Sequence, residues 1–223
     1  MLRSVLVVAG SYLTGAIPVA YVTGRLLRGI DIREHGSKNA GASNVFQSVS
    51  RVAVVPVGLA EIAQGLAGPA FAKSSGESDG VQALAGLASI AAHNWSPFLG
   101  FSGGRGVAHA IGFMLAVSKP ALAAFIVISL IGVRLRRIPQ FVGFGIIAAP
   151  FVARAAGQPR ETVAGMAGMA GLIFAKRLLG NEPPPEGANA GRVLLNRLLY
   201  DRDTSERDAW VRRGLDGKDT NDA

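Results

Sequence analysis

The chain has 223 residues, of which 49% are hydrophobic and only 17% charged, and its mean hydropathy is +0.33. This composition, with 29 glycines, excludes an ordinary soluble domain and indicates one all-α domain in a membrane. The net charge of +8 does not indicate nucleic-acid binding, because 7 of the 23 basic residues follow Glu182 and most others flank apolar segments. With no cysteine and three scattered histidines, no metal site is expected.

Seven apolar segments follow one another along the chain: Ser4–Thr23, Val52–Ala72, Val81–Leu99, Val107–Val117, Ala121–Val133, Phe141–Ala153 and Val163–Phe174. Several are shorter than the ~20 residues of an untilted membrane span. The first segment also resembles a signal peptide with a small-residue cleavage site at Pro18-Val19-Ala20. Arg25 and Arg28, which follow the apolar run, favour a retained helix instead.

The pattern around Lys119-Pro120 permits either one long helix or a tight hairpin, and loop charge favours the hairpin. A hairpin gives about seven short transmembrane helices, with eleven basic residues on the side of the C-terminal tail and five on the other. By the positive-inside rule, the N-terminus is then outside and the C-terminus cytoplasmic, at the cell membrane. A six-span arrangement is disfavoured because it moves Arg134, Arg136 and Arg137 outside.

After the membrane domain of residues 1–182, the composition changes, and residues 183–223 are expected to form a basic cytoplasmic tail. Pro183-Pro184-Pro185 interrupts any helix. Leucines at helical spacing between residues 194 and 199 predict a short amphipathic helix on anionic lipid. Thr204 or Ser205 is expected to cap a second helix through Arg213, with Trp210 at the lipid headgroups.

Three polar or basic stretches fall on the expected cytoplasmic side: Asp31–Gln47, Ala92–Val107 and Lys176–Glu182. In the second, Ser102-Gly103-Gly104-Arg105-Gly106 opens a helix and offers backbone N–H groups and a cation to an anion. It lacks the spacing and the Lys-Ser/Thr pair of a nucleotide P-loop. From composition alone, the first stretch also fits an ordinary loop, and the third fits a basic helix flank.

Two of these stretches carry long motifs of a known family. Residues 35–47 resemble HGSxNxGAxNVxR, and residues 93–108 resemble GHNxSPFLxFKGGKGVA, both from the bacterial acyl-phosphate:glycerol-3-phosphate acyltransferases. The resemblance covers roughly Gly10 to Glu182. It implies a seven-helix inner-membrane enzyme of phospholipid synthesis that moves a fatty acyl group from acyl phosphate to the sn-1 hydroxyl of glycerol 3-phosphate. The product is lysophosphatidic acid, and neither metal nor acyl-CoA is needed.

The resemblance also implies residue roles that suit this chemistry. Acyl phosphate has a good leaving group, so the protein mainly aligns a hydroxyl with the carbonyl and holds two phosphates. Ser37 and Arg105 are the expected catalytic residues. The expected substrate-binding residues are Lys38, Asn39, Asn44, His93, Asn94, Ser96, Gly103, Gly104 and Gly106. His93 equally fits a histidine that bonds backbone at a helix end.

Several family positions differ in this chain. Gln47 stands at an expected arginine, Ser102 at an expected lysine, and Arg105 at a second lysine whose ammonium differs from a guanidinium. The family's Asp-x-x-Lys-Gly segment reads Glu61 to Gly65 and lacks the lysine. Counting back from the Arg-Leu-Leu at residues 177–179 puts the family's histidine and asparagine at Gly171 and Phe174. Candidate replacement donors are Arg33, Lys38, Arg51 and His109.

These departures leave three hypotheses. The first is a divergent acyltransferase with acyl phosphate, glycerol 3-phosphate and membrane lipids as partners. The second is a catalytically impaired paralogue that binds lipid or a partner protein on the same scaffold. The third, a small transporter or channel, is disfavoured because the helices carry almost no polar residues besides Glu61 and Gln64.

Overall fold

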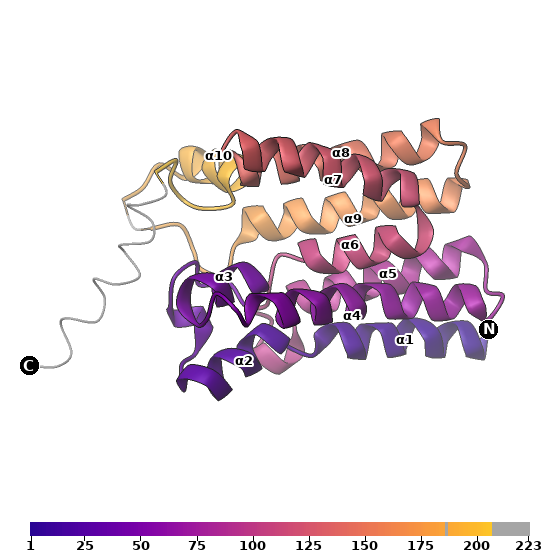
Figure 1. Cartoon of the computed structure of the whole chain (residues 1–223), viewed down its shortest axis with the longest axis horizontal. Helices are drawn as coiled ribbons and strands as arrows, with labels where there is room; N and C mark the ends of the chain where they lie inside the picture. Colours follow the sequence, from indigo (N-terminus) through magenta and orange to yellow (C-terminus); the bar gives the residue numbers. More distant parts are fainter. Residues whose placement is uncertain (186, 207–223) are drawn as a thin grey trace, which may run out of the picture.

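The computed structural model describes residues 1–185 and 187–206, and every regular element in these two ranges is helical. The long helices lie side by side as one bundle (Figure 1). They are α1 (Leu2–Ala16), α4 (Val54–Ser74), α5 (Asp79–Asn94), α6 (Val107–Val117), α7 (Lys119–Arg134), α8 (Ile138–Ala155) and α9 (Arg160–Leu179). Shorter elements are α2 (Val19–Arg28), α3 (Ala42–Ser48), α10 (Ala190–Tyr200) and 3-10 turns at Ile32–Glu34 and Pro97–Leu99.

Four helical stretches are long and apolar enough to cross a membrane: Leu2–Arg28, Val54–Ser74, Ile138–Ala155 and Arg160–Leu179. Large aliphatic and aromatic side chains remain exposed along α1, α4, α7 and α8. Lipid tails cover such a surface, and helices satisfy their own backbone hydrogen bonds inside a bilayer. The protein is therefore a multi-pass membrane protein of the cell membrane.

The apolar segment Ser4–Thr23 lies within the helical stretch Leu2–Arg28, which breaks between α1 and α2. Pro18 lacks an N–H and disfavours helical backbone at the residue before it, and Ile17 accordingly has a ψ of 116°. The helix resumes at Val19 and runs to Arg28, so the first helical stretch reaches further than the apolar segment.

The break at Pro18 leaves carbonyl groups at the end of α1 without helical partners, and two polar side chains donate to them. The Gln64 Nε2 group bonds the carbonyls of Thr14 and Ile17 at 2.7 and 3.1 Å. Ser96 Oγ bonds the carbonyl of Ala16 at 2.7 Å. Gln64, at the family's lysine position, thus joins α4 to the break.

The predicted hairpin at Lys119-Pro120 is confirmed. Helix α6 ends at Val117 and α7 begins at Lys119, with Ser118 between them at φ −150° and ψ 82°. Pro120 lies in the first turn of α7, where its missing N–H leaves no hydrogen bond unmade. Figure 1 shows α7 returning antiparallel to α6.

Helices α4 and α6 pack closely because glycines face the partner backbone. A Cβ on Gly65 would lie 2.1 Å from the His109 carbonyl oxygen. A Cβ on Gly112 would lie 2.0 Å from the Ile62 carbonyl oxygen. Small residues let membrane helices approach in this way.

Helix α1 packs against α5 in the bundle. Ser11 Oγ donates to the Ala85 carbonyl at 2.6 Å, and a Cβ on Gly15 would lie 2.5 Å from the Ser89 carbonyl oxygen. This packing supports a retained first helix over a cleaved signal peptide.

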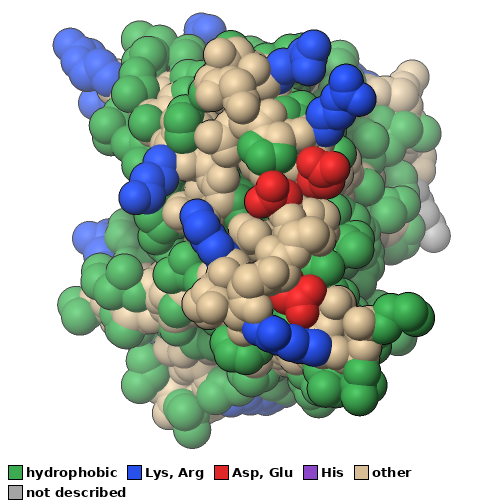
Figure 2. All heavy atoms as spheres, turned by 90° about the vertical axis from the view of Figure 1, so that its right-hand side faces the viewer, with side chains coloured by type: hydrophobic (Ala, Val, Ile, Leu, Met, Phe, Trp, Pro, Cys, Tyr) green, Lys and Arg blue, Asp and Glu red, His purple; other side chains and the backbone are tan. Residues whose placement is uncertain are grey.

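The two ends of the bundle differ. Helices α2, α3 and α10 gather at one end, on the left of Figure 1, together with the connections that follow α5, α7 and α9. The opposite end, which carries the N-terminus, shows charged side chains beside a largely hydrophobic rim (Figure 2). The three polar stretches of the sequence therefore meet at the end away from the N-terminus.

The leucines at residues 194–199 lie on the helix α10, which packs against the ends of α8 and α9. The predicted contact of this helix with anionic lipid stays a prediction. The second tail helix, through Arg213, and Trp210 lie on residues 207–223, outside the described residues. The predicted segment Val81–Leu99 is one helix only to Asn94, and the remainder is a 3-10 turn. The loop expected over Asp31–Gln47 contains the short helix α3.

Candidate functional site

Asn44 organises the first polar loop from its centre. It is fully buried, and its Nδ2 group donates to three main-chain carbonyls of the loop at 2.7–3.0 Å. Its Oδ1 accepts from the Ser37 N–H and the Ser48 hydroxyl at 3.1 and 3.0 Å. Asn44 therefore holds Ser37 in place. Asn44 lines neither of the two cavities described below, and its expected substrate contact stays a prediction.

Asp31 and Arg33 tie this loop to the glycine-rich stretch. The Asp31 carboxylate accepts from Nε and Nη2 of Arg33 at 3.0 and 2.7 Å, and Arg33 Nη1 donates to the Leu99 carbonyl at 2.9 Å. The hydrogen bonds from Arg33 lower the pKa of Asp31. Arg33 lines neither of the two cavities described below, so the structure does not support it as a replacement phosphate ligand.

The glycines before α6 let the backbone pack closely against the end of α5. The N–H groups of Gly103 and Gly104 donate to the carbonyls of Asn94 and His93 at 3.3 and 3.0 Å. A Cβ on Gly104 would lie 2.0 Å from His93 Nε2. These N–H groups already have carbonyl partners in this structure, and their predicted role in phosphate binding stays a prediction. Gly106 has a φ of 73° and lines the larger of the two cavities described next.

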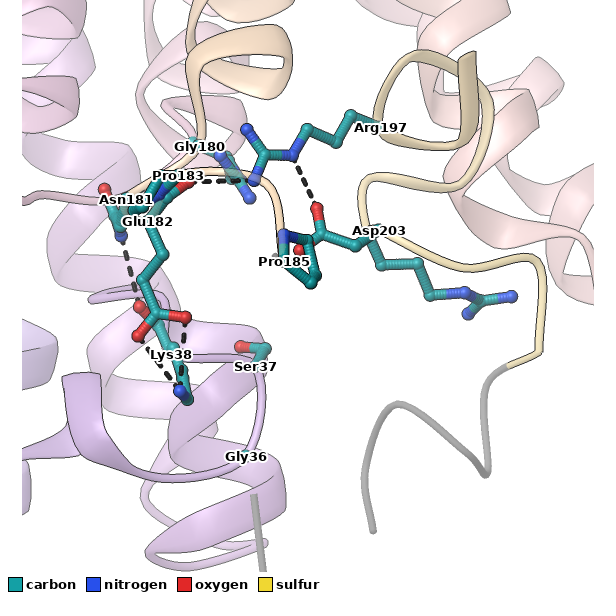
Figure 3. Close-up of a pocket in the computed structure, with 12 residues that line it drawn as sticks. Gly36, Ser37, Lys38, Gly180, Asn181, Glu182, Pro183, Pro185, Arg197 and Asp203 are labelled. Carbon is teal, nitrogen blue, oxygen red and sulfur yellow. Dashed lines mark hydrogen bonds and ion pairs between the residues drawn. The ribbon is translucent and has the colours of Figure 1, made fainter. Parts of the chain in front are cut away.

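Two adjoining cavities lie at this end of the bundle. The larger has a volume of about 560 Å³ and the smaller about 300 Å³, and Ser37, Arg105 and Arg202 line both. The charged side chains of the larger cavity are Glu61, Arg105, Arg136, Arg177, Asp201 and Arg202. Those of the smaller cavity, drawn in Figure 3, are Lys38, Arg105, Glu182, Arg197, Arg202 and Asp203.

Several buried polar atoms at the cavities have no hydrogen-bond partner among the described residues. They are Ser37 Oγ, Asn39 Oδ1, Glu61 Oε1, Arg177 Nε and Asn181 Oδ1. Leaving a buried polar group unpaired costs about 1–3 kcal/mol, so a cluster of such groups indicates a ligand site. Ser37 and Asn39, both predicted site residues, are in this cluster.

Arg105 lies between the two cavities. Its Nη1 group donates to the Lys176 carbonyl at 2.7 Å, and its Nε lies 2.9 Å from Asp201 Oδ1 in an ion pair. Ser37 and Arg105, the two expected catalytic residues, line both cavities. The structure also adds Asp201 from the tail, which sequence reasoning missed.

Lys38 and the segment after α9 close the smaller cavity. Lys38 Nζ donates to both carboxylate oxygens of Glu182, at 2.9 and 3.1 Å (Figure 3). The Asn181 Nδ2 group donates to the carbonyls of Lys38 and Gly103, both at 3.1 Å. Asn181 thereby joins the three polar stretches. Sequence reasoning missed it, and the only signal was its place beside Glu182.

The remaining predicted residues lie deeper. His93 lines the larger cavity, and its ring stacks on that of His109 with centroids 4.1 Å apart. Asn94 is fully buried and its Nδ2 donates to the Leu172 carbonyl at 3.3 Å. Ser96 donates its hydroxyl hydrogen bond to the Ala16 carbonyl at the break after α1. The structure places neither Asn94 nor Ser96 at a cavity.

Gly171 and Phe174 stand at the two positions where counting along the chain puts the family's histidine and asparagine. Gly171 is exposed, with nothing within 4 Å of a Cβ built there, and Phe174 packs under the Arg177 guanidinium at 5.3 Å. Neither lines a cavity, whereas Gln47 does. Among the candidate replacement donors, Lys38 lines the smaller cavity, while Arg51 and His109 line neither.

The fold and the cavities define a class of protein: an integral membrane protein with an arginine-rich site beside apolar helices, suited to a ligand that is both lipid-like and anionic. Residues 5–178 match the sequence profile of the family described as "Glycerol-3-phosphate acyltransferase". The chain belongs to this family. The match ends shortly before the tail.

Two relatives with known names support the same family. The chain is 33% identical over 215 residues to glycerol-3-phosphate acyltransferase 4 of Dehalococcoides mccartyi strain CBDB1, covering 93% of each chain. It is 37% identical over 191 residues to glycerol-3-phosphate acyltransferase of Synechococcus sp. strain JA-2-3B'a(2-13), covering 82% of this chain and 95% of the relative.

Solved structures show the same fold. The glycerol 3-phosphate form of PlsY, described as an integral membrane glycerol 3-phosphate acyltransferase, superposes with a TM-score of 0.76 at 28% identity. The lysophosphatidic acid form superposes with a TM-score of 0.74. Each comparison covers 91% of this chain and 94% of the other.

Proposed function

We propose that the protein transfers a fatty acyl group from acyl phosphate to the sn-1 hydroxyl of glycerol 3-phosphate and forms lysophosphatidic acid. One observation carries this proposal: the two family motifs meet at Ser37 and Arg105, between two cavities, in a chain that belongs to the family. The relatives are named for acyl transfer to glycerol 3-phosphate, which favours an enzyme over an impaired paralogue.

The two cavities suit two different substrates. The larger cavity extends along α6 and α8, where Val107, Ile111 and Val142 add apolar lining, so it suits an acyl chain with a phosphate head. The smaller cavity is lined by charged loop residues and suits the compact, water-soluble glycerol 3-phosphate. Ser37 and Arg105 line both cavities, and the reacting groups meet there.

The reaction needs alignment and charge stabilisation more than a strong acid or base. The sn-1 oxygen attacks the acyl carbonyl carbon, a new ester C–O bond forms, and the bond from that carbon to the phosphate oxygen breaks. Phosphate leaves with the bonding electrons. The hydroxyl loses one proton and the departing phosphate gains one. Fixed donors such as Arg105 and the Ser37 hydroxyl stabilise the developing charge.

Activity of the purified protein in detergent tests this function. We expect phosphate release from palmitoyl phosphate that depends on glycerol 3-phosphate, with lysophosphatidic acid as product. Ser37→Ala and Arg105→Ala abolish it, whereas Ser74→Ala, at the opposite end of the bundle, retains it. A folded wild-type protein that releases no phosphate would overturn the proposal.

The proposed topology has seven membrane helices (α1 with α2, and α4 to α9), an external N-terminus and a cytoplasmic C-terminus. The cavities then open to the cytoplasm. Because the chain has no cysteine, single introduced cysteines test this cleanly. An impermeant maleimide is expected to label Ser75→Cys in intact cells and Arg51→Cys only after permeabilisation. The reverse pattern contradicts the orientation.

A further inference from the structure

One wall of the larger cavity is the start of α8. Ile138, Pro139 and Gln140 all line the cavity, and they form the first turn of this 18-residue helix. The first turn of a helix has N–H groups without helical partners and the positive end of the helix dipole. Pro139 has no N–H, so the donors of this turn are the N–H groups of Ile138 and Gln140. This turn therefore favours an anion in the cavity.

A buried arginine lies beside this turn. Arg177, near the end of α9, is 2% exposed, and its Nη1 group donates at 3.3 Å to the carbonyls of Pro139 and Leu198. Its Nε is buried without a partner among the described residues, although Arg177 lines the cavity. Gly143 of α8 leaves room for it, because a Cβ there would lie 3.1 Å from Nη1.

A second arginine stands at the same wall in an unusual backbone conformation. Arg136 has a φ of 57°, and it lies where the chain turns from α7 into α8. The hydrogen bonds from Arg136 N to the Val133 carbonyl and from Arg137 N to the Gly132 carbonyl close this turn. Arg136 lines the larger cavity, whereas the neighbouring Arg137 lines neither cavity.

The charge of the whole cavity lining also favours an anion. Four arginines line the cavity against two carboxylates, and one of these, Asp201, is already paired with Arg105. Gln47, at a position where the family has an arginine, lines the same cavity. The cavity thus lacks the family cation at Gln47 and carries Arg136, which no family motif includes, beside Arg177 of the family's Arg-Leu-Leu.

We propose that Arg136, Arg177 and the first turn of α8 bind the phosphate of the acyl donor in the larger cavity, with Arg136 supplying the positive charge that is missing at Gln47. This inference rests on the proposed function, since it assigns the donor phosphate to one part of that site. Arg177 anchors the phosphate from the buried side, and Arg136 contacts it from the exposed side.

Steady-state kinetics of the full-length protein in detergent test the inference. Arg136→Gln is the main variant, because Arg136 is exposed and its loss does not threaten folding. Arg137→Gln is the matched control. We expect Arg136→Gln to raise the KM for palmitoyl phosphate about three- to tenfold, with the KM for glycerol 3-phosphate unchanged. Inorganic phosphate, competing with palmitoyl phosphate, should inhibit this variant correspondingly more weakly.

The outcomes separate this inference from the proposed function. An active wild type whose kinetics Arg136→Gln leaves unchanged overturns the inference and leaves the proposed function standing. A rise in the KM for glycerol 3-phosphate alone also overturns it, because the arginine then serves the acceptor. An inactive wild type counts against the proposed function itself. In that event, weaker binding of inorganic phosphate to Arg136→Gln than to Arg137→Gln, measured by calorimetry, still supports the anion site, and equal binding refutes it.

Discussion

Arg105 and Asp201 form an ion pair that joins the glycine-rich stretch to the tail, with Arg105 Nε 2.9 Å from Asp201 Oδ1. Asp201 ends α10 in a left-handed conformation, at a φ of 56°, and lines the larger cavity. The tail therefore supplies a negative charge to the arginine that the family motif assigns to substrate. A substrate phosphate at Arg105 competes with this carboxylate.

Replacing Asp201 should strengthen substrate binding. Asp201→Asn keeps the size of the side chain and removes its charge, so Arg105 becomes fully available to phosphate. Partly exposed ion pairs contribute up to about 1 kcal/mol, and we expect the KM of the substrate that contacts Arg105 to fall about two- to fivefold. Steady-state kinetics measure this, with Asp203→Asn, which removes the partner of Arg197 instead, as the control. A raised KM would show that Asp201 positions Arg105.

Substitutions of Asn44 and Asn39 should separate an effect on stability from an effect on substrate binding. Asn44→Ala removes the centre of the first loop and leaves several buried groups unpaired, at a cost of about 3 kcal/mol in the free energy of unfolding. Asn39→Ala removes a cavity-lining oxygen that has no partner among the described residues, so it should affect KM and leave stability nearly unchanged. Thermal unfolding in detergent, measured beside activity, distinguishes them. Equal melting temperatures for the two variants would contradict this assignment.

Asp31 should make the first loop sensitive to acid. Its pKa is lowered below 3.8 in the folded protein by the hydrogen bonds from Arg33. A lowered folded pKa means that the stabilisation is complete above the unfolded value, near 4, and is lost as pH falls through the folded pKa. Asp31→Asn should therefore lower the melting temperature at pH 7, and the difference from wild type should shrink towards pH 3. A difference that stays constant over this range would exclude the Asp31 charge as the cause.

Two glycines in the bundle should respond oppositely to alanine. Gly112→Ala places a Cβ against the backbone of α4 and should destabilise the protein by about 2 kcal/mol. Gly171→Ala meets no atom within 4 Å and should be neutral or stabilise α9 by up to about 1 kcal/mol. Unfolding of both variants in the same detergent tests the packing. A tolerated Gly112→Ala would contradict the close crossing of α4 and α6.

The membrane class, most helices and the motif residues at the site follow from the sequence because their signals are local. Apolar segments mark the helices, Lys119-Pro120 marks a hairpin, and leucine spacing marks α10. Ser37 and Arg105 are found through motifs of neighbouring residues. Counting along the chain does not show which side of α9 a residue faces, because helical phase decides it, and Gly171 faces outward.

Only the tertiary structure decided which polar groups meet. Arg136 from the α7–α8 turn, Arg177 from the end of α9 and Asp201 after α10 share one cavity, because the bundle brings these segments to the same end. The same packing gives Asn44, Ser96 and Gly104 hydrogen-bond partners within the protein. Hydrophobic periodicity records which side of a helix faces protein or lipid, whereas the partner of a polar side chain depends on residues far along the chain.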